Sequence, residues 1–176
     1  GNTAELKKNI NTVLKTAALI SLPAACGLIA IGGRITEFLY DTEASAVIGG
    51  EMLTLYGFAA LFAGFLVPLG GILQALGKQN AVLLNTAAGT AVKLLVNIIA
   101  VAVPKINVMS AALGTVLCFF VIFLLDIEVL IKATGFAPDT ANVFLKPLVS
   151  AALCGLAARL TVRLGSSRVV TLLAVI

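Results

Sequence analysis

The chain of 176 residues is 60% hydrophobic and 11% charged, carries a net charge of +4, and contains neither histidine nor tryptophan. An ordinary soluble domain has roughly 25% charged residues, so this composition is typical of a membrane protein. The lack of histidine removes the commonest metal ligand and the usual general base, which argues against a hydrolase or a metalloenzyme. We therefore expect no cofactor and no metal site, and we attribute the basic residues to lipid contact rather than to nucleic-acid binding.

The first two apolar runs predict two membrane-spanning helices separated by an interfacial segment. The first span is expected over about residues 12–33, with a kink or a local break at Pro23. The second is expected over residues 52–75, where several glycines predict a pliable or closely packed helix. Between them, residues 34–50 mix acidic and aromatic side chains, which favours a loop or a short amphipathic turn at the far membrane surface. Arg34 is a candidate for steering an anionic substrate at the outer mouth, although an interfacial anchor is favoured.

The rest of the chain predicts three further spans and the beginning of another. These are expected over residues 81–103, 108–131 and 142–164, followed by an apolar run at 169–176 that is too short to cross a bilayer. The fifth span is the weakest, because it needs its basic residues to reach the two membrane surfaces: Lys146, Arg159 and Arg163. No run alternates apolar and polar residues over strand length. The predicted fold class is an all-α polytopic transmembrane helix bundle with five full spans and a truncated sixth, and the working molecule is expected to be longer.

Lys93 is the most informative residue, because it falls near the middle of the third predicted span. Residues 80–103 contain no other charge. A lysine at the centre of a membrane helix costs about 2.5–3.5 kcal/mol on insertion scales, so a watered cavity or an anionic partner should offset it. Thr86, Gly89, Thr90, Lys93 and Asn97 recur at steps of three and four and predict one stripe of polar and small residues. Its four polar members are the candidate substrate-cavity residues; the alternative is a helix–helix contact in which Lys93 pairs with an acid or reaches the surface.

Two carboxylates lie near the end of the fourth predicted span. Asp126 and Glu128 are two residues apart and point to different faces of a helix, so they are not a catalytic pair. Glu128 is spaced to pair with Lys132 at the membrane surface. Asp126 lies deeper and is a candidate for binding a coupling cation or pairing with a lysine, although a structural or interfacial role is favoured.

Uncharged polar residues and cysteines in the spans have simpler interpretations. Interhelical hydrogen bonds of about 0.6 kcal/mol account for Gln74, Asn85 and Asn97. The three cysteines lie in apolar runs without CxxC spacing, which predicts packing residues rather than disulfides or a metal site: Cys26, Cys118 and Cys154.

Charge counting does not decide how the chain is oriented in the membrane. With a cytoplasmic N-terminus, the inside ends of the spans hold six basic residues and the outside ends hold five. The acidic residues between the first two spans would then lie outside, which agrees with this orientation, although acids contribute little to it.

Four short motifs, in the same order along the chain, resemble those of the polysaccharide flippases. Residues 22–28 are similar to the family's LPAAxGL, and residues 71–78 to its xILQAxGK. Residues 92–97 are similar to xKLxxN and include Lys93 and Asn97. Residues 106–115 are similar to INxxGAALxT, with Ser110 in place of the usual glycine.

The chain most resembles the stage V sporulation protein B-like branch of the multidrug/oligosaccharidyl-lipid/polysaccharide (MOP) flippase superfamily, which includes lipid II flippases. The resemblance implies the C-terminal lobe of a two-lobed transporter that works by alternating access in the bacterial cytoplasmic membrane. It implies a lipid-linked saccharide precursor as cargo, and as partners the membrane lipids and an N-terminal lobe of the same chain. The arginines that this family is thought to use most lie in that other lobe. No established binding residue is therefore carried over, and Lys93 and Asn97 are candidates on their own chemistry.

Three other functions stay open on the sequence alone. A cation-coupled exporter of the multidrug and toxin extrusion type should prefer deep carboxylates to a deep lysine, and Asp126 is the candidate here. A membrane-embedded glycosyltransferase or polymerase should carry catalytic acids in a soluble loop, and residues 34–50 contain acids without an acid/base constellation. A membrane scaffold without transport activity is the third alternative.

Overall fold

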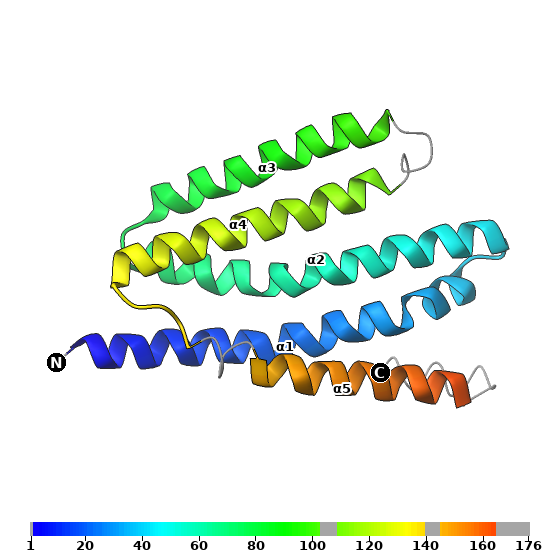
Figure 1. The fold of residues 1–176 in the computed structure, drawn as a ribbon, viewed down its shortest axis with the longest axis horizontal. Helices are drawn as coiled ribbons and strands as arrows, with labels where there is room; N and C mark the ends of the chain where they lie inside the picture. The colour runs from blue at the N-terminus through cyan, green and yellow to red at the C-terminus, as the bar shows by residue number, and fades with distance from the viewer. Residues whose placement is uncertain (1, 103–108, 140–144, 165–176) are drawn as a thin grey trace.

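The computed structural model describes residues 2–102, 109–139 and 145–164, which form five helices (Figure 1). In chain order these are α1 (Asn2–Leu39), α2 (Glu43–Ala75), α3 (Gln79–Val101), α4 (Ser110–Thr134) and α5 (Lys146–Leu164). None of the described ranges contains a strand. The helices α1 to α4 are long and apolar enough to cross a membrane, which confirms the predicted all-α polytopic fold.

The predicted interfacial loop over residues 34–50 is wrong, because helix continues through most of it. α1 runs to Leu39 and α2 begins at Glu43, so the two helices are joined by a very short connection. Buried Thr36 and Ala46 extend the packing of α1 against α2 into this segment. Glu37, Phe38 and Glu43 occupy exposed helix faces, where charge is compatible with helical backbone, and Tyr40 and Asp41 lie exposed in the short connection.

α1 and α5 also differ in detail from the predicted spans. α1 has 38 residues, which is about 57 Å of helix, and it continues through Pro23 without the break considered above. The apolar stretch of α5, Pro147–Ala157, is shorter than those of the four helices that could cross a membrane. The fifth crossing therefore remains a prediction. The sixth apolar run at 169–176, and the side chains expected to reach the surfaces from α5, lie outside the described residues.

Glycines at seven-residue intervals on α2 bring its backbone against α1. A Cβ atom at Gly50 would lie 2.9 Å from the Cα of Gly33, and one at Gly57 would lie 2.5 Å from the Cγ1 of Ile29. A Cβ at Gly64 would overlap Ser21. Small residues that allow two backbones to approach are the usual basis of helix association in membranes. These glycines therefore explain why α1 and α2 form a closely packed antiparallel pair.

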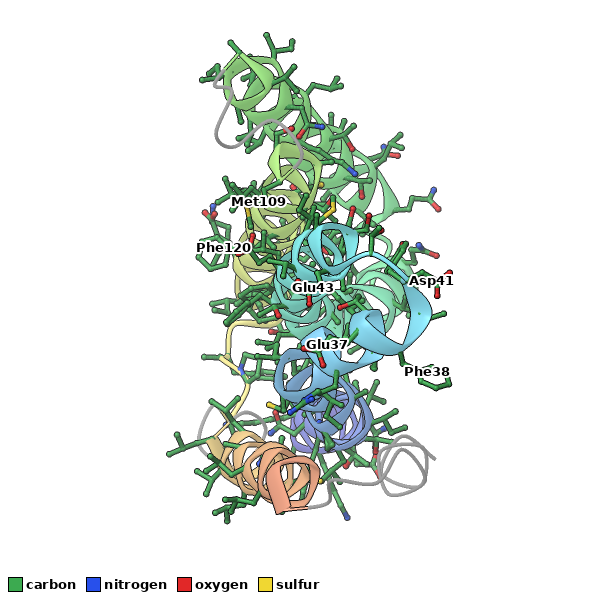
Figure 2. The ribbon with its side chains drawn as sticks, turned by 90° about the vertical axis from the view of Figure 1, so that its right-hand side faces the viewer. Glu37, Phe38, Asp41, Glu43, Met109 and Phe120 are labelled. Carbon is green, nitrogen blue, oxygen red and sulfur yellow. The ribbon has the colours of Figure 1, made fainter. Side chains whose placement is uncertain are left out.

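The helices are arranged as a row in the order α5, α1, α2, α4, α3, which appears in Figure 1 from bottom to top and edge-on in Figure 2. The main hydrophobic core lies between α1, α2, α4 and α5. It consists of Ile10, Leu14, Ala18, Leu22, Phe65, Leu69, Leu73, Leu130 and Ala151. α3 stands at the end of the row, packed mainly on α4. The contact between α3 and α4 therefore determines the position of α3 and of Lys93 on it.

All three cysteines are free thiols. Cys118 is buried and Cys26 is partly buried against Gly155 of α5, which confirms their predicted packing roles. Cys154 is exposed on α5, so for this residue the packing prediction is wrong within the described part of the chain.

Candidate functional site

The contact between α3 and α4 is a ladder of polar and small residues, which we call the polar seam. On α3 it comprises Asn85, Gly89, Lys93 and Asn97, and on α4 it comprises Asp126, Ile122, Cys118 and Gly114. Each step of four residues forward on α3 matches a step of four back on α4, as expected for two antiparallel helices. The seam therefore places one pair of facing residues at each helical turn.

At the first level of the seam, two polar side chains are joined across the helices. The Nδ2 atom of Asn85 donates a hydrogen bond of 2.8 Å to Oδ1 of Asp126. Asp126 is only 1% exposed, and Asn85 is 9% exposed. Residues 52–77 contain no charge, so α2 supplies no counter-charge to Asp126 along its span. The structure thus places Asp126 inside the bundle rather than at its surface, with an amide as its hydrogen-bond partner.

Glycines at the second and fourth levels allow α3 and α4 to approach closely. A Cβ atom at Gly89 would overlap the side chain of Ile122 and lie 3.0 Å from the carbonyl oxygen of Cys118. A Cβ at Gly114 would overlap Oδ1 of Asn97 and lie 3.3 Å from the carbonyl oxygen of Lys93. Larger residues at either glycine would separate the two helices.

Lys93 and Asn97 occupy the third and fourth levels. Lys93 is partly buried, and its carbonyl oxygen faces Gly114 of α4. No carboxylate in the described part of the chain forms an ion pair with Lys93. Oδ1 of Asn97 is buried and has no hydrogen-bond partner among the described residues. Leaving such an acceptor unsatisfied costs about 1–3 kcal/mol, so this oxygen is poised to accept a donor.

The two threonines of the predicted stripe are not part of the seam. Thr86 and Thr90 are exposed, and each hydroxyl donates to the carbonyl oxygen four residues earlier, Val82 for Thr86 and Thr86 for Thr90. The position buried against α4 is Asn85, the neighbour of Thr86. The structure therefore brings Lys93 and Asn97 together on the seam and leaves both threonines on an exposed edge of α3.

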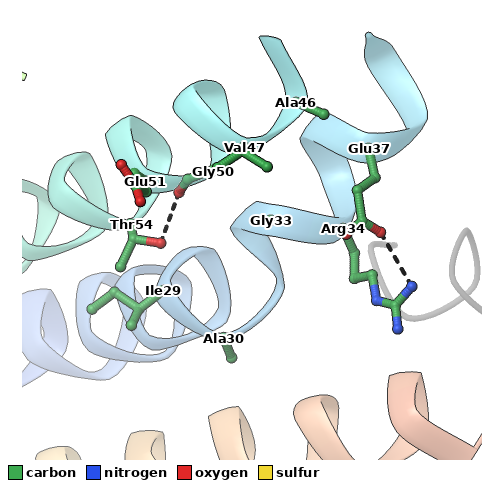
Figure 3. Close-up of a pocket in the computed structure, with 10 residues that line it drawn as sticks. All are labelled: Ile29, Ala30, Gly33, Arg34, Glu37, Ala46, Val47, Gly50, Glu51 and Thr54. Atoms are coloured by element: carbon green, nitrogen blue, oxygen red, sulfur yellow. Dashed lines mark hydrogen bonds and ion pairs between the residues drawn. The ribbon is translucent and has the colours of Figure 1, made fainter. Parts of the chain in front are cut away.

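Arg34 lies elsewhere, in a pocket between the far ends of α1 and α2 (Figure 3). This pocket has a volume of about 420 Å³, and its polar lining includes Arg34, Glu37, Glu51 and Thr54. NH1 of Arg34 is 3.1 Å from Oε2 of Glu37, and both side chains are more than half exposed. An exposed pair of this kind contributes little to stability, so Arg34 is available to other anions. A second, apolar cavity of about 240 Å³ lies between Leu22, Phe62, Phe123 and Leu148.

Residues 2–102, 109–139 and 145–164 contain no group of side chains arranged to hold a metal ion. The Lys132–Glu128 pair predicted at the end of α4 is confirmed as an exposed contact between side chains. The interhelical hydrogen bond predicted for Asn85 is confirmed, although its partner Asp126 was not predicted. For Asn97, Oδ1 has no partner among the described residues, and its fit against Gly114 was not predicted. The spacing of four residues between Asn85, Gly89, Lys93 and Asn97 was the sequence signal for the face of α3 that packs on another helix. The sequence of α3 alone does not show which residues of α4 lie opposite.

The MatE family model matches residues 1–99, which is more than half of the chain and covers α1, α2 and most of α3. The chain belongs to the MatE family. The matched region of this MatE chain includes Lys93 and Asn97, and the family lies within the MOP superfamily.

Comparison with curated proteins gives a relative with a stated function. The lipid II flippase MurJ of Bacillus subtilis (strain 168) is 28% identical over 112 residues, which is 63% of this chain and 20% of the relative. The MatE chain thus matches about a fifth of the length of that relative. No solved structure matches. The chain is a multi-pass membrane protein of a transporter family rather than of an enzyme family.

Proposed function

We propose that this chain is part of a flippase that moves a lipid-linked oligosaccharide or polysaccharide precursor across the bacterial cytoplasmic membrane by alternating access. Its membership of the MatE family and its similarity to a lipid II flippase support a transporter of this type. The observation that carries the proposal is Lys93, a mid-helix cation on a polar seam without an ion-pair partner in the described part of the chain. The membrane lipids and an N-terminal lobe of the same protein are the partners that we expect.

The proposed role of Lys93 is to neutralise an anionic headgroup while it passes through the membrane. Two opposite unit charges 4 Å apart attract by about 4 kcal/mol at an effective dielectric constant of 20. That attraction is of the size needed to offset the insertion cost of the lysine, which is about 2.5–3.5 kcal/mol. Thr86 and Thr90 add hydroxyls on the exposed edge of α3, and Arg34 offers an anion contact at the far end of α1.

Substitution of Lys93 in the complete protein tests this role. Lys93→Ala should reduce translocation of the lipid-linked precursor at least tenfold, because the cargo's negative charge would then enter the membrane without a counter-charge. Lys93→Arg should be milder, since the charge is kept. The measurement is translocation in vesicles, together with growth of a strain that lacks its own flippase.

Lys78→Ala is the matched control, because Lys78 is exposed in the turn between α2 and α3. It should translocate at the unsubstituted rate. Full complementation by a normally expressed Lys93→Ala protein would contradict the proposal.

A further inference from the structure

The side chains of Lys93 and Asn97 are placed so that one can reach the other. They are one helical turn apart on the same face of α3, and both are partly buried towards α4. Side chains on a helix lean towards its N-terminus, so the carboxamide of Asn97 leans over Lys93. The carbonyl oxygen of Lys93 and Oδ1 of Asn97 both face the Cα atom of Gly114.

The position of Oδ1 in Asn97 is determined by the neighbouring helix. Any Cβ at residue 114 would overlap this oxygen, so Gly114 provides the space that it occupies. The oxygen is nevertheless buried without a donor from the described residues. The ammonium group of Lys93 carries three donors and no acceptor, which makes it the complementary group within one turn.

We propose that Asn97 is a positioning residue for Lys93: its Oδ1, which has no donor in the arrangement described here, accepts the ammonium group when the Lys93 side chain turns towards it, and releases the group when an anionic headgroup arrives. This inference rests on the proposed function of Lys93. A neutral amide suits such a role, because its hydrogen bond to an ammonium group is weaker than an ion pair and an anion can displace it. A carboxylate at the same position would compete with the cargo for Lys93.

A double-mutant cycle in the complete protein tests the contact without relying on transport. Asn97→Asp should raise the midpoint of thermal unfolding when Lys93 is present, because an ion pair forms. The same substitution should lower the midpoint in a Lys93→Met background, because the new carboxylate is then buried without a partner. Equal shifts in the two backgrounds would overturn the inference, since a merely structural asparagine would respond alike in both.

Translocation is measured on the same variants. Asn97→Asp should reduce it at least tenfold while the protein becomes more stable, a combination that misfolding does not produce. Thermal coupling with unchanged translocation would support the contact and overturn instead the role of Lys93 in moving cargo. If Asn97→Asp does not express, Asn97→Leu completes the same cycle, with a loss of stability expected only when Lys93 is present. Thr16→Val on α1 is the control, because Thr16 is exposed, lies outside the proposed site, and donates its hydroxyl to a carbonyl oxygen of its own helix.

Discussion

The bond between Asn85 and Asp126 shows how a single polar contact can fix one helix against another. Both residues are buried, they are 41 positions apart in the sequence, and they join α3 to α4. When a buried carboxyl group loses its hydrogen-bond partner, the folded state is destabilised by the full desolvation free energy of that group. The contact therefore contributes more to the placement of α3 than its one hydrogen bond suggests.

We expect Asn85→Ala to lower the free energy of unfolding by about 1–3 kcal/mol, because it leaves the Asp126 carboxyl without this donor. Asp126→Asn should be milder, since an amide still accepts a hydrogen bond from Asn85. Unfolding of the purified protein in detergent measures both. An Asp126→Asn variant that is as unstable as Asn85→Ala would show that the charge of Asp126, rather than the hydrogen bond, matters.

The same Asp126→Asn variant examines the alternative function, a cation-coupled exporter. Transport that keeps its sodium or proton dependence after this substitution would exclude Asp126 as the coupling site.

Lys93 could be selected from the sequence as a candidate functional residue, because an isolated charge in an apolar run has few explanations. The sequence could not identify the partners of Asn85 and Asn97. Hydrophobic periodicity shows which face of a helix is polar, but the register between two helices depends on packing far along the chain. The assignment of Thr86 to the same stripe as Lys93 failed for this reason, since a rotation by one residue brings Asn85 to α4 instead.

At the scale of the helices, the extent of α1 and α2 is set by their mutual packing. The charges in residues 34–50 suggested a loop, because a membrane helix was expected to end where polar residues begin. Instead, the two helices continue together beyond the apolar runs, held by the approach of Gly50 to Gly33. The apolar pattern therefore predicted where the helices are, but not where they end.

Gly57→Ala tests this packing. The added Cβ would lie 2.5 Å from the side chain of Ile29 and 3.3 Å from the carbonyl oxygen of Ala25, so the helices must separate. Overpacking of this kind costs about 1–3 kcal/mol. Gly71→Ala on the same helix is the control, because a Cβ there meets nothing within 4 Å. Similar stability for both variants, measured by thermal unfolding, would argue against the close α1–α2 contact.

At the scale of the whole molecule, the lysines are unevenly distributed between the two ends of the helices. Glu37, Asp41, Glu43 and Glu51 lie with Arg34 at one end, which faces the viewer in Figure 2. The opposite end of the helices carries Glu5 and Glu128 together with five lysines, Lys7, Lys8, Lys15, Lys78 and Lys132. Counting basic residues along the sequence left the orientation undecided. Among the side chains that the structure describes, five lysines lie at one end of the helices and Arg34 lies at the other, so we expect the lysine-bearing end to face the cytoplasm.

Site-specific labelling tests this orientation. In a cysteine-free variant, Asp41→Cys should react with a membrane-impermeant maleimide in intact cells. Gln79→Cys, at the first residue of α3 and therefore at the opposite end of the helices, should react only after permeabilisation. The reverse pattern would place the N-terminus of α1 outside.

The glycines of α2 also determine how freely this protein can change during evolution. Gly50, Gly57 and Gly64 each leave no room for a side chain, whereas α3 has one crowded side and a wide face of exposed leucine and isoleucine. A survey of natural or random variants should then find α2 intolerant of larger residues at these three glycines and tolerant of them at Gly71, where an added Cβ meets nothing within 4 Å. On α3, apolar residues should exchange freely everywhere except along the row that begins at Asn85. Amino-acid substitutions would accumulate rapidly at the exposed positions of these helices and very slowly where two backbones are in contact.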